Sequence, residues 1–375
     1  MARRQEQEPA RAQVTEVARN VLRMELPIQI QGLGHVNCYA ITDSRGAAVV
    51  DPGLPGPGTW RVLQERLAQI GLRPRDVHTV IISHSHPDHF GCAVRFAKES
   101  GARVVAYHNF QFGPYTAPPT PEVSVDDLAE HHVHAHGEPQ ADEPPVSESV
   151  AAALAEAHEI LRRAQALGRT PWGGQRPMPP FLLRMRFRVM RWLGQSFVPV
   201  ITAPVEHGDV LELGGREWFV VHTPGHTSDH FCLHDPADGV LIAGDHVLPT
   251  ITPHISGIAS SPDPLASFFY SLDRVGEIAH VSQVLPAHGH PFDDLPGRTQ
   301  AIKRHHHERL ERVKSLSREF GRFASVQEFS QRLFQPRSWG AMAESETYAH
   351  LEHLRIAGSA ERRPDATGML LYQAG

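Results

Sequence analysis

Residues 83–91, Ser83-His84-Ser85-His86-Pro87-Asp88-His89-Phe90-Gly91, form the segment from which the fold of this chain can be inferred. They follow the β-branched run 77–82 (VHTVII), which predicts a buried strand. His84 and His86 stand two residues apart at the end of that strand, so their side chains emerge on the same side. Imidazole nitrogen combined with carboxylate oxygen suits zinc, and also iron or manganese. Four such side chains crowded into one short loop therefore indicate a metal site.

Three other predicted strands end in residues of the same kinds. Apolar runs lead to TPGHT (residues 223–227), AGDH (243–246) and PAHGHP (286–291). Each segment places a histidine or an aspartate beside glycine or proline, which lets the backbone turn sharply. Open α/β folds place their sites at the carboxyl ends of strands. We therefore expect these segments to meet residues 83–91 around one site.

Taken together, the motifs HxHxDH, PGHT, GD and a histidine before glycine resemble the ligand series of the metallo-β-lactamase superfamily, over roughly residues 15–300. The resemblance implies an α/β fold, the αββα sandwich of two similar halves, and two divalent metal ions, zinc first, with iron or manganese as alternatives. It also implies seven ligands: His84, His86 and His226 for the first metal, Asp88, His89 and His288 for the second, and Asp245 bridging both.

The residue at position 245 bears on the activity that the resemblance implies. Zinc β-lactamases of the best-known class have cysteine where this chain has Asp245, so β-lactam hydrolysis is not expected. Aspartate is typical of thioesterases such as glyoxalase II, of lactonases, and of the superfamily's phosphodiesterases and nucleases. We expect a hydrolase of a thioester, ester or lactone. A phosphodiesterase or endoribonuclease is the first alternative, and an iron-binding oxygenase-type relative is the second.

A two-metal hydrolase activates water between its cations, and the protein supplies ligands and proton carriers. Asp88 and Asp245 are the expected catalytic residues, because either can pass a proton to the leaving group. Asp51, which ends a strand in VVDPG, is a candidate to orient a ligand histidine, with a simple turn cap as the alternative. His230 and His246 are candidates for substrate contact.

The strand and helix patterns divide the chain into four parts. We expect a first half of the metallo-β-lactamase domain at 14–110, a helical insertion and candidate lid at 111–199, a second half at 200–318, and a C-terminal unit at 320–375. The insertion predicts helices at 147–167 and 181–193, the second with an arginine face that is either part of a lid or simply solvated.

The C-terminal unit has a winged-helix outline: helices at 325–333 and 345–355, then a hairpin ending at 369–372. That outline is similar to lactamase-β-like proteins that carry a C-terminal winged helix. Because its second helix carries little basic charge, packing or homodimer formation is favoured over nucleic-acid binding.

Composition narrows the class of protein. The net charge of −6 disfavours a dedicated nucleic-acid binder, and neither a signal peptide nor a membrane span is evident, so the cytoplasm is expected. Three widely spaced cysteines, Cys38, Cys92 and Cys232, predict buried core residues and not a disulfide framework. The expected partner is a small-molecule substrate with an acyl chain, which aromatic residues of the insertion suit: Phe181, Phe187, Trp192 and Phe197.

Histidine is unusually frequent, with 26 residues, and most of them need an explanation other than metal binding. The histidines at 131, 132, 134 and 136 fall in the insertion, where a solvated segment is expected. His305, His306 and His307 are consecutive on a predicted helix, so they face three directions and cannot bind one ion together. Surface positions are expected for these three.

Overall fold

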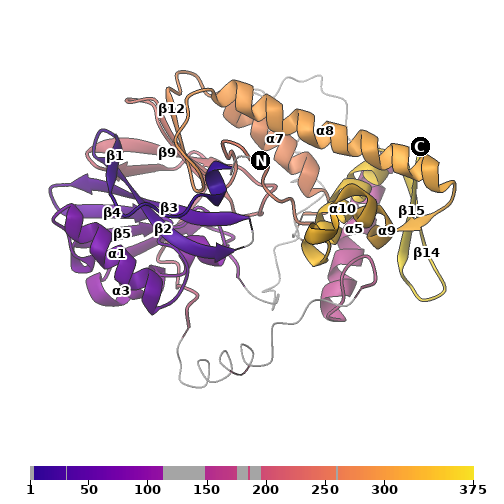
Figure 1. The fold of residues 1–375 in the computed structure, drawn as a ribbon, viewed down its shortest axis with the longest axis horizontal. Coiled ribbons are helices and arrows are strands. Elements are labelled where there is room, and N and C mark those ends of the chain that lie inside the picture. The colour runs from indigo at the N-terminus through magenta and orange to yellow at the C-terminus, as the bar shows by residue number, and fades with distance from the viewer. Residues whose placement is uncertain (1–3, 31, 113–147, 175–184, 186–195, 259–260) are drawn as a thin grey trace.

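The computed structural model describes residues 4–30, 32–112, 148–174, 185, 196–258 and 261–375, and it contains two large β-sheets stacked face to face. The first sheet (Figure 1) follows chain order: β1 (Thr15–Ala18), β2 (Val21–Ile30), β3 (Leu33–Asp43), β4 (Gly46–Val50), β5 (Val77–Ile81), β6 (Arg103–Tyr107) and β7 (Ala203–Val205). Its strands β1 to β4 are antiparallel, and β4 to β7 run parallel.

The second sheet has the order β12-β11-β10-β9-β8. Its strands are β8 (Val210–Leu213), β9 (Arg216–His222), β10 (Phe231–Asp235), β11 (Val240–Gly244) and β12 (Gln283–Pro286). Only the pairing of β11 with β12 is parallel among the pairs recorded in this sheet. The parallel pairs matter for the site, because they align the carboxyl ends of neighbouring strands.

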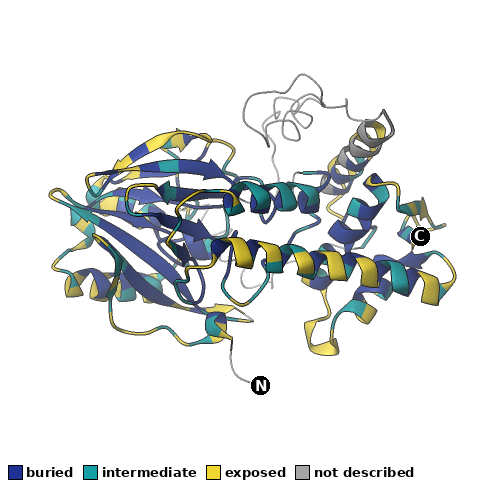
Figure 2. Ribbon diagram, turned by 90° about the horizontal axis from the view of Figure 1, so that it is seen from above, coloured by how far each residue is buried: buried dark blue, intermediate teal, exposed yellow. Residues whose placement is uncertain are grey.

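Three hydrophobic layers show the αββα arrangement that the sequence predicted. The inner layer lies between the sheets, where Ile41 and Ile81 of the first sheet pack with Trp218 and Phe231 of the second. The helices α1 (Pro57–Gln69) and α3 (Ala93–Ser100) cover the outer face of the first sheet. The helices α7 (Pro264–Gly276) and α8 (Leu295–Phe320) cover the outer face of the second. Figure 2 shows the resulting contrast between buried strands and exposed outer helix faces. The 3₁₀ helices Gln5–Gln7 and Pro74–Asp76 and the short helix α2 (Pro87–Phe90) complete this part.

Capping residues in the sequence explain where helices α8 and α9 begin and where α8 ends. The Asp294 carboxylate accepts a 2.9 Å hydrogen bond from Gly297 N at the start of α8, and the helix stops at Gly321, whose φ is 61°. A left-handed residue of this kind is favourable only for glycine, which explains why α8 ends there. Ser325 and Glu328 form a reciprocal capping box at the next helix, α9 (Val326–Leu333).

The C-terminal part contains the elements that the sequence predicted. After α9 come the turn Pro336–Ser338, α10 (Ala341–Ile356) and the hairpin β14 (Ala360–Pro364) with β15 (Leu370–Ala374), and β15 also pairs with the short β13 (Ala324–Ser325). In Figure 1, α8 runs from the sandwich to this C-terminal part. One hydrophobic cluster extends along it, from Leu241 and Val284 in the second sheet to Phe329 and Tyr372. The winged-helix interpretation and the four domain boundaries stay predictions.

The insertion is described only in part. The predicted helix 147–167 is present as α5 (Glu148–Ala166), and it docks on the C-terminal part through Glu156, which pairs with Arg355 at 3.3 Å and Arg362 at 2.7 Å. Trp172 O accepts a 3.2 Å hydrogen bond from Leu370 N. The predicted helix 181–193, residues 131–136, and the aromatic residues at 181, 187 and 192 lie outside the described residues. Phe197 packs with the outer core of the first sheet.

One prediction about histidine was wrong. His306 is fully buried, although its neighbours are half-buried (His305) and exposed (His307). The three do face different directions, but the middle one faces α10, where its Nδ1 lies 3.1 Å from His350 Nε2. The three cysteines are buried and unpaired, as expected. Among the described helices, none has the length and apolar character needed to span a bilayer.

Candidate metal centre

The seven residues implied as ligands come from strand ends of both sheets. His84, His86, Asp88 and His89 follow β5, the last two within α2. His226 follows β9, Asp245 follows β11, and His288 follows β12. The two stacked sheets thus bring four distant segments to one edge of the sandwich. The seven side chains form two compact groups, His84, His86, His226 and Asp245, and Asp88, His89 and His288, and the ligand atoms of each group lie within 4.8 Å of one another.

The first group has the spacing of a single cation site. His86 Nδ1 lies 3.0 Å from His84 Nε2 and 3.1 Å from His226 Nε2. Asp245 Oδ2 lies 3.5 Å from His226 Nε2 and 3.9 Å from His84 Nε2. Tetrahedral zinc, bound at roughly 2.1 Å by each donor, keeps its ligands about 3.4 Å apart. The donor set and its spacing therefore fit a zinc-like ion.

The second group shares Asp245 with the first. Asp88 Oδ2 lies 3.7 Å from both His89 Nε2 and His288 Nε2. Asp245 reaches the same two imidazoles, with Oδ2 3.6 Å from His89 Nε2 and Oδ1 3.3 Å from His288 Nε2. A carboxylate in this position can contact two cations at once, which matches the bridging role implied by the resemblance.

Several polar atoms of the centre are buried without a conventional partner. Within the described part of the chain, His89 Nε2, His288 Nε2 and Asp245 Oδ1 make no hydrogen bond of acceptable geometry. Buried polar atoms are normally satisfied, because leaving one unpaired costs about 1–3 kcal/mol. A bound cation would satisfy all three atoms, so the residues present fit a metal ion.

Asp51 lies behind the ligands and orients two of them. Its Oδ2 accepts a 2.8 Å hydrogen bond from His89 Nδ1 and a 2.7 Å hydrogen bond from Ser83 Oγ. Ser83 Oγ in turn lies 3.0 Å from His84 Nδ1, which donates to it. The Asp51 carboxylate is itself held by Ser83 N at 2.8 Å. Asp51 occupies the orienting position expected from the sequence, and it does so with a φ of 54°, a conformation that costs a non-glycine residue free energy.

Backbone carbonyls orient two further histidines. His226 Nδ1 donates to His254 O at 2.7 Å, and His288 Nδ1 donates to His35 O at 2.7 Å. Histidines that bind metals commonly donate their second N–H to a carboxylate or carbonyl, which fixes the tautomer and leaves the other nitrogen free for the ion. The contacts of His226 and His288 follow this pattern.

Burial and neighbouring charges set the protonation of the centre. Burial lowers the pKa of His84 and His86 well below the usual value, and the neighbouring histidines lower it further, so both imidazoles are neutral and able to bind metal. Burial would also lower the pKa of His89, but the carboxylates of Asp51, Asp245 and Asp88 raise it well above the usual value.

Asp245 is the charge that links the two groups. Burial alone would raise the pKa of this carboxyl, yet His288 and His89 hold it well below its usual range. Burial likewise lowers the pKa of His288, and Asp245 more than reverses that effect. The carboxylate is therefore ionised, as a metal ligand must be.

The two histidines expected to contact substrate occupy other positions. His230 is fully buried: its Nδ1 lies 2.7 Å from Thr223 Oγ1, and its Nε2 accepts a 3.1 Å hydrogen bond from Asp245 N. Its ring therefore holds the backbone of Asp245 in place. His246 is also fully buried, with its ring edge-on to Phe268, and burial lowers its pKa to about 3. Neither position fits substrate contact.

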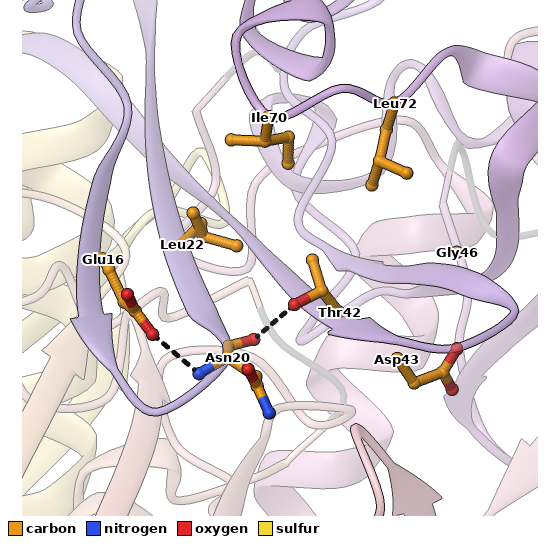
Figure 3. Close-up of a pocket in the computed structure, with 8 residues that line it drawn as sticks. All are labelled: Glu16, Asn20, Leu22, Thr42, Asp43, Gly46, Ile70 and Leu72. Carbon is orange, nitrogen blue, oxygen red and sulfur yellow. Dashed lines mark hydrogen bonds between the residues drawn. The ribbon is translucent and has the colours of Figure 1, made fainter.

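A separate hollow lies away from the metal centre. Figure 3 shows residues that line it, among them Glu16, Asn20, Thr42 and Leu72. The hollow has a volume of about 480 Å³. It adjoins the β3–β4 turn at the start of β4, whereas Asp51 follows the other end of that strand. The hollow and the centre thus occupy opposite ends of the sheet.

Comparison with known proteins adds independent information. The family model described as "Metallo-beta-lactamase superfamily" matches residues 31–319. A hydroxyacylglutathione hydrolase of Maricaulis maris is 35% identical over 91 residues, which cover 24% of this chain and 34% of that protein. An atrochrysone carboxyl ACP thioesterase of Cryptosporiopsis sp. is 30% identical over 146 residues, covering 37% of this chain and 43% of that protein. The chain thus matches less than half the length of these two relatives.

A solved structure resembles nearly the whole chain. A metallo-beta-lactamase family protein from Thermus thermophilus superimposes with a TM-score of 0.67 at 26% identity. The superposition covers 95% of this chain and 99% of that one. The likeness therefore extends beyond the stacked sheets that carry the metal centre.

Proposed function

The chain belongs to the metallo-β-lactamase superfamily, and from this premise we propose that it is a hydrolase that binds two divalent metal ions and cleaves a thioester, ester or lactone of a small molecule. The observation that carries the proposal is Asp245, whose two carboxylate oxygens reach both groups of histidines at 3.3–3.9 Å. Zinc is the ion we propose, because imidazole and carboxylate donors at this spacing suit it.

Two cations bound at this centre supply Lewis acidity and water activation near neutral pH. The protein's own residues hold the imidazoles in place, with those of His84 and His86 neutral, and keep the ionised Asp245 between the two groups. Asp88 and Asp245 are the groups we propose to carry a proton to the leaving atom. Their side chains are only 9% and 10% exposed, so such a proton would be shielded from bulk water.

The class of substrate is supported by the relatives. One relative is named for hydrolysing an acylglutathione and another for releasing an acyl group from a carrier protein, and both names describe thioester cleavage. The phosphodiesterase or endoribonuclease alternative depends on a basic channel formed by arginines at 184, 186, 188 and 191. All four positions lie outside the described residues. That alternative, the oxygenase alternative, a homodimer and a cytoplasmic location stay predictions.

The test is metal analysis followed by steady-state assays of the zinc-loaded protein on acyl-CoA, acyl-glutathione and lactone panels. We expect about two ions per chain and turnover of at least one panel, lost in His86→Ala. A protein that binds two ions yet hydrolyses no member of the three panels would contradict the proposed substrate class. A protein that binds no divalent ion would contradict the proposal as a whole.

A further inference from the structure

The C-terminal helix α10 reaches the metal centre through one loop. We propose that Glu346 of α10 positions the ligand His226 by holding His254, so that one of the two metal-binding groups depends on the C-terminal part of the chain. The inference rests on the proposed function, in which His226 binds a metal. It assigns Glu346 a positioning role that neither motif nor spacing in the sequence indicated.

The chain of contacts has two hydrogen bonds. His226 Nδ1 donates to His254 O at 2.7 Å, and His254 Nδ1 donates to Glu346 Oε2 at 3.3 Å. The other carboxylate oxygen of Glu346 accepts from the Arg309 guanidinium on α8. The side chains of Glu346 and His254 are 13% and 23% exposed, so both contacts are largely shielded from water, which strengthens them.

The loop that carries His254 is anchored independently on its N-terminal side. Glu6 Oε1 accepts from Thr250 N at 2.7 Å and from Ile251 N at 3.1 Å, and an Arg298 nitrogen donates to Ile251 O at 2.6 Å. These contacts come from the start of the chain and from α8. They should keep the loop in place when Glu346 is changed.

On its C-terminal side the loop touches α10 directly. Gly257 N donates to Ser345 Oγ at 3.0 Å, and a Cβ added at Gly257 would lie 2.6 Å from Ser345 O and 2.6 Å from Tyr348 Cδ1. Only glycine permits this close approach. His254 thus lies between two anchored points, and Glu346 contacts the side chain of the residue whose carbonyl orients His226.

The second metal-binding group has different supports. His89 is oriented by Asp51 and His288 by His35 O, and both supports belong to the first sheet or its loops. The positioning contact from α10 therefore reaches only the group that contains His226. A change at Glu346 should weaken one ion and leave the other.

The experiment measures the two zinc affinities separately, by competition of the full-length protein with a chromophoric chelator, and records the absorption spectrum of the Co²⁺-loaded protein. For Glu346→Ala we expect one affinity to fall about 10-fold, as is typical when a supporting partner is lost, with the other within about twofold. The Co²⁺ bands of one site should shift or weaken. Glu346→Gln keeps an acceptor for His254 and should lose less.

Unchanged affinities in Glu346→Ala would overturn the inference, and so would an equal loss at both sites, which would indicate general loosening. Arg309→Gln breaks the ion pair between helices but leaves the His254 contact, so both affinities should stay within about threefold. A loss in Arg309→Gln as large as in Glu346→Ala would assign the effect to helix packing instead.

A double variant tests the route. His254→Ala keeps the carbonyl but removes the imidazole, so adding Glu346→Ala to it should produce no further loss if Glu346 acts through that ring. A further loss would contradict the route through His254. Glu308→Gln, on the exposed face of α8, is the matched control. Failure of the wild-type protein to bind metal would refute the proposed function, whereas normal binding in both wild type and Glu346→Ala would refute this inference alone.

Discussion

Among the residues that the structure describes, neighbouring histidines are buried at the metal centre at the strand ends and at the contact between α8 and α10. At the metal centre, imidazole nitrogens converge on one another and on Asp245, and several buried polar atoms lack a hydrogen bond among the described residues. At the helix contact, His306 Nδ1 lies 3.1 Å from His350 Nε2, and His350 Nδ1 donates to Glu346 O at 2.7 Å. Burial of histidines is common to both, and His306 Nε2 at the helix contact also lacks a hydrogen bond among the described residues. The metal centre differs in that several imidazole nitrogens able to bind a metal converge on one carboxylate, that of Asp245.

The strongest test of this difference removes the shared carboxylate. Asp245→Asn should lower kcat/KM about 1000-fold or more and reduce bound metal, because one change affects both ligand groups, and stabilisation by bound metal amounts to several kcal/mol. His306→Gln, in the other cluster, should keep kcat/KM within about twofold. Similar losses in both variants would show that the two clusters do not differ as we infer.

Metal removal should destabilise the protein through the metal centre and not through the contact between α8 and α10. Chelation should lower the melting temperature, since an ion that binds the folded state at a thousandfold excess over its Kd contributes about 4 kcal/mol. Calorimetry with and without chelator measures the shift. His306→Leu should show the same metal-dependent shift as wild type, and a reduced shift would mean that the helix contact takes part in metal binding.

A smaller loss is expected when a supporting residue of the metal centre is changed. Asp51→Asn removes the charge that orients His89 and, through Ser83, His84, so metal affinity or kcat/KM should fall about 10- to 100-fold. Asp273→Asn, a half-exposed aspartate on α7, is the control. An Asp51→Asn protein with wild-type affinity and activity would argue that the two histidines are positioned without it.

The smallest effect concerns acid stability at the helix contact. Burial lowers the pKa of His306 to about 2 and of His350 to about 4, from 6.5, so the folded protein keeps both rings neutral. The two histidines bind protons below pH 6.5 in the unfolded chain but not in the folded one, so acid favours unfolding. Their contribution to the free energy of unfolding is therefore fully present above pH 6.5 and is lost as the pH falls towards 4. In chelator-treated protein, His306→Leu should reduce this loss by about 1–2 kcal/mol between roughly pH 7.5 and pH 5. Urea unfolding at the two pH values measures it, with the exposed His307→Gln as control, and equal losses in variant and wild type would contradict it.

The sequence predicted the metal centre better than its surroundings. His84, His86, Asp88 and His89 share one short loop, so their proximity follows from chain connectivity. Asp51 was a candidate to orient a histidine because it ends the strand beside β5, but a simple turn cap was equally compatible with the sequence. The carbonyls of His35 and His254 were not predictable, since any residue can supply a backbone oxygen and no residue type marks the position.

The error at His306 has a different cause. Ile302, His306 and Leu310 recur at helical spacing, and all three are buried. That spacing predicts a buried position at 306, but the prediction treated the three consecutive histidines as one group and placed all of them at the surface. Glu346 was missed because its contact with His254 joins elements 92 residues apart, a separation that local patterns cannot bridge.

Helix α8 also constrains how shortened forms of this protein can be made. It is 26 residues long, about 39 Å, and the match to the superfamily ends at residue 319, inside its last turn. Leu310, Val313 and Leu316 on this helix are buried in the same cluster as Phe329 and Tyr372. A recombinant fragment that stops at residue 319, where the family model ends, would expose an apolar stripe worth about 2 kcal/mol per side chain, and we expect it to precipitate. The end of the family match and the end of the unit that we expect to fold on its own are therefore different positions in this protein.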